Sequence, residues 1–201
     1  MDVAPAIEVQ ALGSRFLDDI VGIHLDGLGY TLNSRLGPEH LKFLYQTMAE
    51  DPGCYVGVAL LGGVPAGVVS GTVDADRLKS RVIKSTTLRQ RLSIAGAFIL
   101  RPGLLVEWAK ESVIGERLFY EGEQVVATLT TLSVDSRFRN RGVGHELVRA
   151  LERFLSGRKV LSYRLETLVR NEAARDFYTT LGFKVAGRRA GSYVLVKGIA
   201  Q

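Results

Sequence analysis

The stretch LSVDSRFRNRGVGHELVRALERFL, residues 132–155, decides the fold. It predicts an apolar strand that ends at Val134, a short basic loop, and a helix that begins at Val143 with apolar side chains at helical spacing. Gly142 and Gly144 lack the side chains that would block a ligand from the backbone. Because the first amides of a helix point outward at the positive end of its dipole, this turn predicts a site for an anion such as a pyrophosphate.

Basic side chains surround this helix start and favour the anion interpretation. They are Arg137, Arg139, Arg141 and His145. Two common nucleotide motifs do not fit, because the segment lacks the Lys-Ser or Lys-Thr of a P-loop and the third glycine of a dinucleotide fingerprint. The alternative is a helix start whose glycines serve close packing alone.

A second informative segment is LETLVRNEAARDFYTTLGF, residues 165–183. It predicts the end of a strand and then a helix from Asn171 to Leu181, which Gly182 ends. Together the two segments resemble the signatures of the GNAT superfamily of N-acetyltransferases. Residues 139–144 match the pattern Arg/Gln-x-x-Gly-x-Gly/Ala, and the second segment carries Asn171, Ala174, Phe177-Tyr178 and Leu181-Gly182-Phe183. The resemblance covers about residues 122–197, and Ser136 departs from it where family members often carry proline.

The rest of the chain predicts further strands and helices in a mixed order. Strands are expected at 6–12, 55–61, 64–73, 125–134, 160–169, 183–188 and 192–197, with helices from Ser14, at 38–48, 87–100 and 104–113. The resemblance implies an α/β (α+β) fold with a mixed, mostly antiparallel central sheet flanked by helices. We expect one domain over residues 1–201, with a helical insert at about 75–120 between the third and fourth strands. The insert is expected to pack on the core, or else to wall the acceptor site or form the face of a homodimer.

The resemblance also implies an enzyme that transfers an acetyl group from acetyl-coenzyme A to a primary amine, by direct attack in a ternary complex. The coenzyme is expected in a cleft where the fourth and fifth strands splay apart. Its arm would bond backbone groups of Leu132, Ser133 and Val134 and contact Asn171. Its pyrophosphate would lie at Arg139, Asn140, Arg141, Gly142, Val143 and Gly144, with His145 facing a phosphate.

Two side chains are candidates for the acid–base chemistry. Tyr178, seven residues after Asn171, is expected near the sulfur, where its phenol can protonate the departing thiolate. Its alternative role is core packing beside Phe177. Glu166, five residues before Asn171, is the candidate base, at a spacing similar to that in bacterial enzymes that acetylate ribosomal-protein N-termini. The alternative for Glu166 is a solvated strand carboxylate.

The acceptor is expected to be a small molecule such as an amino sugar. The segment LGPEHLKFLYQ, residues 36–46, is similar to GNAT members linked to amino-sugar modification in polysaccharide pathways. The alternatives are a protein N-terminus or lysine as acceptor, or a catalytically silent domain that senses acyl-coenzyme A.

Composition limits the partners. Net charge is +5, but residues 137–201 carry 14 Lys or Arg against 5 Asp or Glu, which indicates an anionic partner. Coenzyme A accounts for this charge, and no nucleic acid is expected because exposed aromatic residues are not interleaved with it. The one cysteine, Cys54, and three scattered histidines predict neither a disulfide nor a metal site. The N-terminus resembles no signal peptide, and the longest apolar stretch, 92–100, is too short to span a membrane, so we expect a cytoplasmic protein.

Overall fold

The computed structural model describes residues 6–103, 118–189 and 191–199. Within them, one seven-stranded sheet has the order β1 (Ile7–Ala11), β2 (Cys54–Leu61), β3 (Val64–Thr72), β6 (Thr128–Val134), β7 (Ser162–Leu168), β9 (Ser192–Gly198) and β8 (Lys184–Arg189). Only β6 and β7 pair in parallel; every other neighbouring pair is antiparallel. The expected mixed, mostly antiparallel sheet is therefore confirmed.

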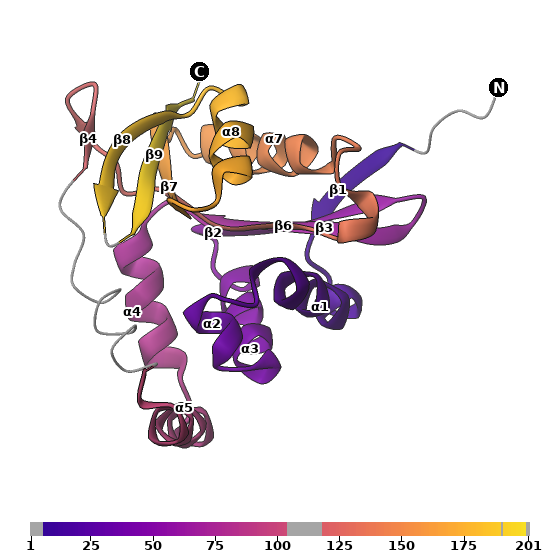
Figure 1. Cartoon of the computed structure of the whole chain (residues 1–201), viewed down its shortest axis with the longest axis vertical. Coiled ribbons are helices and arrows are strands. Elements are labelled where there is room, and N and C mark those ends of the chain that lie inside the picture. Colours follow the sequence, from indigo (N-terminus) through magenta and orange to yellow (C-terminus); the bar gives the residue numbers. More distant parts are fainter. Residues whose placement is uncertain (1–5, 104–117, 190, 200–201) are drawn as a thin grey trace.

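Helices cover both faces of the sheet (Figure 1). One face carries α1 (Leu17–Leu28), α2 (Leu32–Arg35) and α3 (Pro38–Ala49), and the other carries α7 (Val143–Ser156) and α8 (Glu172–Thr180). Each layer has its own apolar core. Leu147, Leu151 and Tyr163 are fully buried under α7 and α8, while Ile20 and Leu41 are fully buried under α1 and α3. This burial of both sheet faces is the main stabilising contribution to the fold.

Glycine and proline residues in the sequence correctly predict several ends of helices and strands. Gly62 and Gly63 have φ of 60° and 81°, the left-handed conformations that a two-residue hairpin turn requires. Pro38 stands at the first position of α3, where its missing N–H costs nothing. In contrast, Ser14 lies in a short 3-10 turn (Ser14–Phe16) before α1 and does not cap that helix. Residues 29–37, GYTLNSRLG, are loop-like in sequence but contain α2, whose start is capped by the Thr31 hydroxyl.

The insert between β3 and β6 begins with two helices, α4 (Ala75–Ser85) and α5 (Leu88–Leu100). The sequence predicts α5 but not α4. A small hairpin of β4 (Phe119–Tyr120) and β5 (Glu123–Gln124) precedes β6, which starts three residues later than expected. The predicted helix 104–113 lies outside the described residues. Core packing, expected of the insert, is wrong for α5, because none of its side chains that the structure describes is buried.

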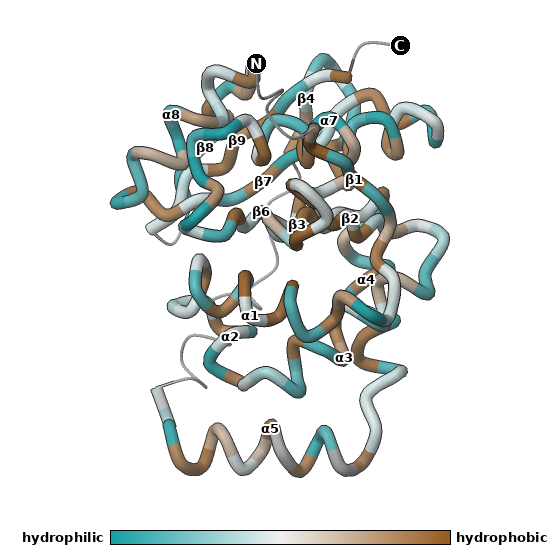
Figure 2. Tube along the Cα trace, turned by 90° about the vertical axis from the view of Figure 1, so that its right-hand side faces the viewer, coloured by the Kyte–Doolittle hydropathy of each residue, from teal (hydrophilic) through white to brown (hydrophobic). Residues whose placement is uncertain are grey.

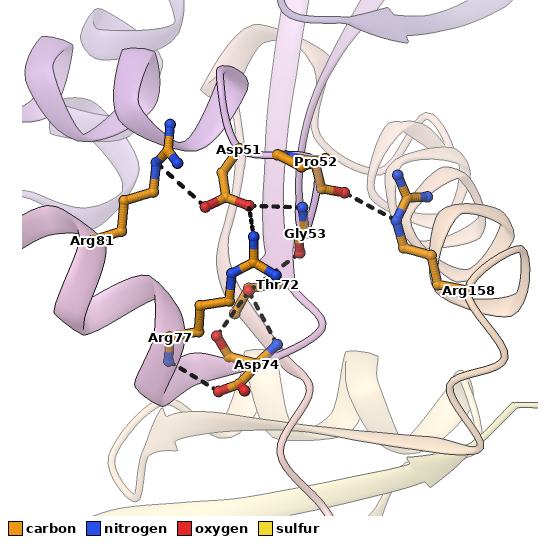
Figure 3. Close-up of polar contacts among 8 residues, drawn as sticks. All are labelled: Asp51, Pro52, Gly53, Thr72, Asp74, Arg77, Arg81 and Arg158. Atoms are coloured by element: carbon orange, nitrogen blue, oxygen red, sulfur yellow. Dashed lines mark hydrogen bonds and ion pairs between the residues drawn. The ribbon is translucent and has the colours of Figure 1, made fainter.

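A buried carboxylate attaches α4 to the turn between α3 and β2 (Figure 3). The Asp51 side chain, only 2% exposed, accepts the backbone N–H of Gly53 at 2.7 Å. It also pairs with Arg77 at 3.6 Å and with Arg81 at 3.3 Å, both from α4. The first turn of α4 is itself capped by Asp74. A buried charge thus anchors the insert, together with the apolar contact of Leu78 with the core.

Candidate active site

A β-bulge in β6 lies at the centre of the site. The pairing of β3 with β6 shifts between Ser70↔Thr131 and Gly71↔Leu129, which leaves Thr130 as an extra residue. The hydroxyls of Ser70 and Thr130 lie 2.7 Å apart and share a hydrogen bond. A bulge bends its strand and disrupts the local ladder, so it turns the second half of β6 away from its regular course.

Beyond the bulge, β6 and β7 separate. Their only register pair is Thr128↔Arg164, near the start of both strands, supported by a hydrogen bond from Arg164 N–H to the Ala127 carbonyl at 3.0 Å. Residues 132–134 lie on the separated part of β6. Backbone groups that face the gap lack a sheet partner there, so they can bond an extended ligand. The predicted splay between these two strands is present, whereas the contacts of Leu132, Ser133 and Val134 with a cofactor stay a prediction.

The start of α7 has the expected outward-pointing amides. Its N-cap, Gly142, has φ of 84° and supplies no side chain to the first amides. Gly144 lies under an aromatic ring: a Cβ added there would be 3.1 Å from Cζ of Phe177. The left-handed backbone therefore explains why residue 142 is a glycine, and close packing against Phe177 explains why residue 144 is one. The backbone amides of the turn stay available to an anion.

The basic residues of this loop differ in what they contact. Arg137 donates to Asp135 at 3.0 and 2.7 Å, and this bonding lowers the pKa of the Asp135 carboxyl. Arg139 donates to the Val134 carbonyl at 3.2 Å and lies 3.9 Å from Asp26. Arg141 is exposed and forms no ion pair with any described acidic residue. Of the three arginines, Arg141 thus keeps the most freedom to meet a phosphate.

His145 and Asn171 occupy the starts of α7 and α8. The His145 ring is exposed and meets the edge of Phe177, with centroids 5.1 Å apart. Asn171 caps α8, because its side-chain oxygen accepts the Ala174 N–H at 3.2 Å. This capping bond is a structural role in addition to the predicted contact with a pantetheine arm.

Tyr178 lies in an aromatic cluster at the base of α8. Its ring meets Phe177 and Phe183 edge-on, with centroids 5.2 and 5.4 Å apart, and the residue is 7% exposed. Burial raises its pKa well above the usual value, and the nearby Tyr30 phenol raises it further. The phenol is therefore protonated at neutral pH, but a higher pKa also makes it a weaker acid, so its role as proton donor to the thiolate stays a prediction.

Two loops meet beside Tyr178. Tyr30, 44% exposed, follows α1, and the guanidinium of Arg170 from the β7–α8 connection lies 6.0 Å from the centre of its ring. The sequence predicts that the loop at residues 30–35, which begins with Tyr30, lines the acceptor site opposite the insert, but Arg170 was missed. Its position next to Asn171 was the only available signal.

Glu166 lies on β7 opposite Val194 of β9, and its side chain is exposed. Strand alternation places it on the other face from Tyr163 and Leu165, which pack under α7 and α8. The candidate base and the candidate acid therefore approach the gap from opposite faces of the sheet. The structure gives Glu166 no ion pair within its described residues.

A polar chain that sequence reasoning missed runs through the other core layer. The His24 Nδ1 atom and the Tyr45 hydroxyl share a hydrogen bond of 2.7 Å, and Thr131 of β6, next to the bulge, acts to lower the pKa of the Tyr45 phenol, which burial raises. Burial lowers the pKa of His24 to about 4, so the ring is neutral at pH 7. The only signal was a histidine on the apolar side of α1.

No group of three or more His, Cys, Asp or Glu residues that could hold a metal occurs among the described residues. Over the same residues, no helix is long and apolar enough to cross a membrane. Cys54 is buried at the start of β2, and burial raises the pKa of its thiol. It therefore has the features of a packed side chain rather than of a nucleophile.

A sheet parted between parallel strands, with an uncapped helix start at one end and a buried phenol beside the gap, is the arrangement that the resemblance implied for an acyltransferase that uses an acyl-coenzyme A. The family comparison is specific: residues 17–183 match the acetyltransferase (GNAT) family. The chain belongs to this family, so it is an acetyltransferase and its acetyl donor is acetyl-coenzyme A.

Individual relatives span several kinds of acceptor. Over 91 residues the chain is 31% identical to histone acetyltransferase MCC1 of Arabidopsis thaliana, a match that covers 43% of this chain and 37% of that protein. Among solved structures, an aminoglycoside N-acetyltransferase AAC(6')-Iy in complex with CoA superposes with a TM-score of 0.64 at 13% identity, covering 94% of each chain. The ribosomal-protein-S18-alanine N-acetyltransferase of Escherichia coli gives 0.60 at 16%, covering 98% of this chain and 96% of that one. At such low identities the two solved structures show that the fold is shared, and they do not identify the acceptor of this chain.

Proposed function

We propose that this acetyltransferase acts on the primary amine of a small molecule such as an amino sugar, by direct attack in a ternary complex. The observation that carries the proposal is the contact of Tyr30 with Arg170 beside the Tyr178 hydroxyl. If the thioester lies beside Tyr178, the two loops that meet there would narrow the approach of the acceptor. A slender amine passes such an opening more easily than a segment of folded protein.

The donor's place follows from the helix start and the open strand edge. The amides at Gly142, Val143 and Gly144 would receive the pyrophosphate, together with Asn140 and the guanidinium groups of Arg139 and Arg141. The free edge of β6 at 132–134 would hold the pantetheine arm, with Asn171 on its other side. This arrangement points the thioester toward Tyr178.

The reaction forms a C–N bond and breaks a C–S bond. The amine nitrogen attacks the thioester carbonyl and loses a proton, which Glu166 accepts directly or through water. The coenzyme leaves as a thiolate, which Tyr178 protonates. Because the two groups lie on opposite faces of the sheet, both can act on one tetrahedral intermediate without competing for space.

The alternative acceptors have some support. Similarity to a histone acetyltransferase and to an alanine N-acetyltransferase favours a protein amine. Likeness to an aminoglycoside N-acetyltransferase is in line with an amino sugar. The presence of both Asn171 and Tyr178 at the spacing that the resemblance implies argues against a catalytically silent sensor.

The test is release of free thiol from acetyl-coenzyme A with panels of amino sugars, other small amines and peptides. We expect amino sugars to react faster than peptides. Arg170→Ala should raise the KM of the acceptor and leave that of acetyl-coenzyme A unchanged. Arg188→Ala is the matched control, since its guanidinium lies 5.9 Å from the Tyr193 ring in a comparable contact on β8. Faster reaction with peptides would overturn the small-molecule proposal, and tight acyl-coenzyme A binding without thiol release would favour the sensor.

A further inference from the structure

Helix α5 presents an apolar surface to solvent. Leu88, Leu92, Ile99 and Leu100 are between 65% and 82% exposed. The first three, with Ala95, recur at the spacing of one helical face. Figure 2 shows α5 lengthwise at the far end of the molecule, beyond α2 and α3, with hydrophobic positions along it. Isolated exposed leucines are ordinary, but a continuous apolar face indicates a partner.

The charge around this face is strongly positive. Residues 75–103 contain seven Lys or Arg and one Asp, a net charge of +6, whereas the rest of the chain carries −1. Arg77 and Arg81 are engaged by Asp51. Lys79, Lys84 and Arg91 are exposed and pair with no acidic residue in the part of the chain that the structure describes. Three exposed cations without a described ion pair thus lie on α4 and α5, and Arg91 is on the same helix as the apolar face.

We propose that α5, with the end of α4, docks on an anionic lipid surface. Helices that combine exposed Leu and Ile with nearby Lys and Arg bind at the membrane interface, where the apolar side chains enter the headgroup region and the cations meet anionic lipids. Ile83, 58% exposed near the end of α4, extends the apolar part. Self-association through this face is disfavoured, because it would bring two segments of +6 together.

The Asp51 anchor holds the helix that leads into the proposed docking surface. It ties α4 to the α3–β2 turn, so α5 projects from a fixed base rather than from a free linker (Figure 3). Docking through α5 leaves α7 and α8, on the opposite side of the sheet, facing away from the lipid (Figure 1). The coenzyme side would thus stay open to solvent while the protein is bound.

The experiment is co-sedimentation of the full chain with vesicles of phosphatidylcholine alone, or of phosphatidylcholine mixed with phosphatidylglycerol. We expect binding to the mixed vesicles only, weakened by high salt. The double variant Leu92→Ser with Ile99→Ser should lose at least about tenfold in affinity, and so should Lys84→Glu with Arg91→Glu. Leu161→Ser with Val185→Ser is the control, since these residues are exposed to a similar degree elsewhere, at 53% and 52%.

Thermal unfolding and acetyl-coenzyme A affinity of each variant should equal those of the parent, which separates docking from folding. Failure of the parent to bind the mixed vesicles would overturn the proposal, as would an equal loss in the control variant. A parent that is dimeric in solution and becomes monomeric with Leu92→Ser and Ile99→Ser would assign the face to a second copy of the chain instead.

Discussion

Mild acid should destabilise the protein through His24. This side chain is 5% exposed within the α1–α3 core layer. Its Nδ1 atom bonds the Tyr45 hydroxyl, and its Nε2 atom has no hydrogen-bond partner among the described residues. A proton added to the ring would place an uncompensated charge in that core, and this is why burial lowers the pKa from 6.5 to about 4.

The sign follows from which state binds the proton first. As pH falls through about 6.5, the unfolded chain protonates its exposed imidazole while the folded ring stays neutral, so the free energy of unfolding decreases. The contribution is fully present above about pH 6.5 and is lost by about pH 4. At about 1.4 kcal/mol for each unit of pKa, a shift of about 2.5 units corresponds to about 3 kcal/mol.

Urea unfolding at a series of pH values measures this effect. We expect the parent to lose about 3 kcal/mol more than His24→Asn between neutral pH and about pH 4, because asparagine can bond Tyr45 but cannot take up the proton. His40→Asn is the control: burial lowers the pKa of His40 too, but that side chain is only half-buried, so the difference should be smaller. Parallel pH profiles for parent and His24→Asn would refute the reasoning.

Three further perturbations test the site and the insert. Tyr178→Phe should lower kcat about 100-fold with little change in acetyl-coenzyme A affinity, measured by thiol release at saturating substrate; unchanged turnover with chemistry rate-limiting would leave Tyr178 a packing role. Gly142→Ala should lower the free energy of unfolding in urea by about 1 kcal/mol, because φ is 84° although the new Cβ would have room, 3.7 Å from Ile7. The control Gly13→Ala, at φ of −97°, should leave the free energy of unfolding unchanged. Equal losses in the two variants would contradict this account. Asp51→Ala should lower the free energy of unfolding by about 3 kcal/mol, and Asp51→Asn by less, since asparagine still accepts the Gly53 N–H. If calorimetry finds the two variants equally destabilised, the charge alone stabilises this contact.

The strands of the sheet and the helices that follow β6 and β7 could be predicted from the sequence, because each is specified by residues close together in the chain. Helical spacing located α7, Asn171 and Gly182 bounded α8, and the Gly62-Gly63 pair located a hairpin. Helix α4 was missed although Asp74, a local signal, caps its first turn; its attachment could not be predicted because it depends on Asp51, an ion-pair partner more than twenty residues away. Periodicity carries no information about such a contact.

The candidate site was predictable in part. Residues 132–134, Gly142 and Tyr178 lie on the elements that the resemblance implied, although their roles in binding and catalysis stay predictions. The bulge at Thr130 was not foreseen, since a bulge depends on the register between two strands rather than on either strand alone. The contact of Tyr30 with Arg170 joins loops that are far apart in the chain, and no local pattern specifies it.

The separation of β6 from β7 makes the sheet mechanically discontinuous. Four strands on one side and three on the other are joined in register only at Thr128 and Arg164. A coenzyme arm bound between β6 and β7 would contact both halves of the sheet and restrict their motion relative to each other. Binding of the donor would therefore make the sheet more rigid. At a free donor concentration [L] it raises the free energy of unfolding by RT ln(1 + [L]/Kd). Backbone amides along the gap should also exchange with deuterium more slowly when the donor is bound. The empty enzyme would be the compliant form, open to a donor, and the loaded enzyme the stiff form that holds the thioester in place for the amine.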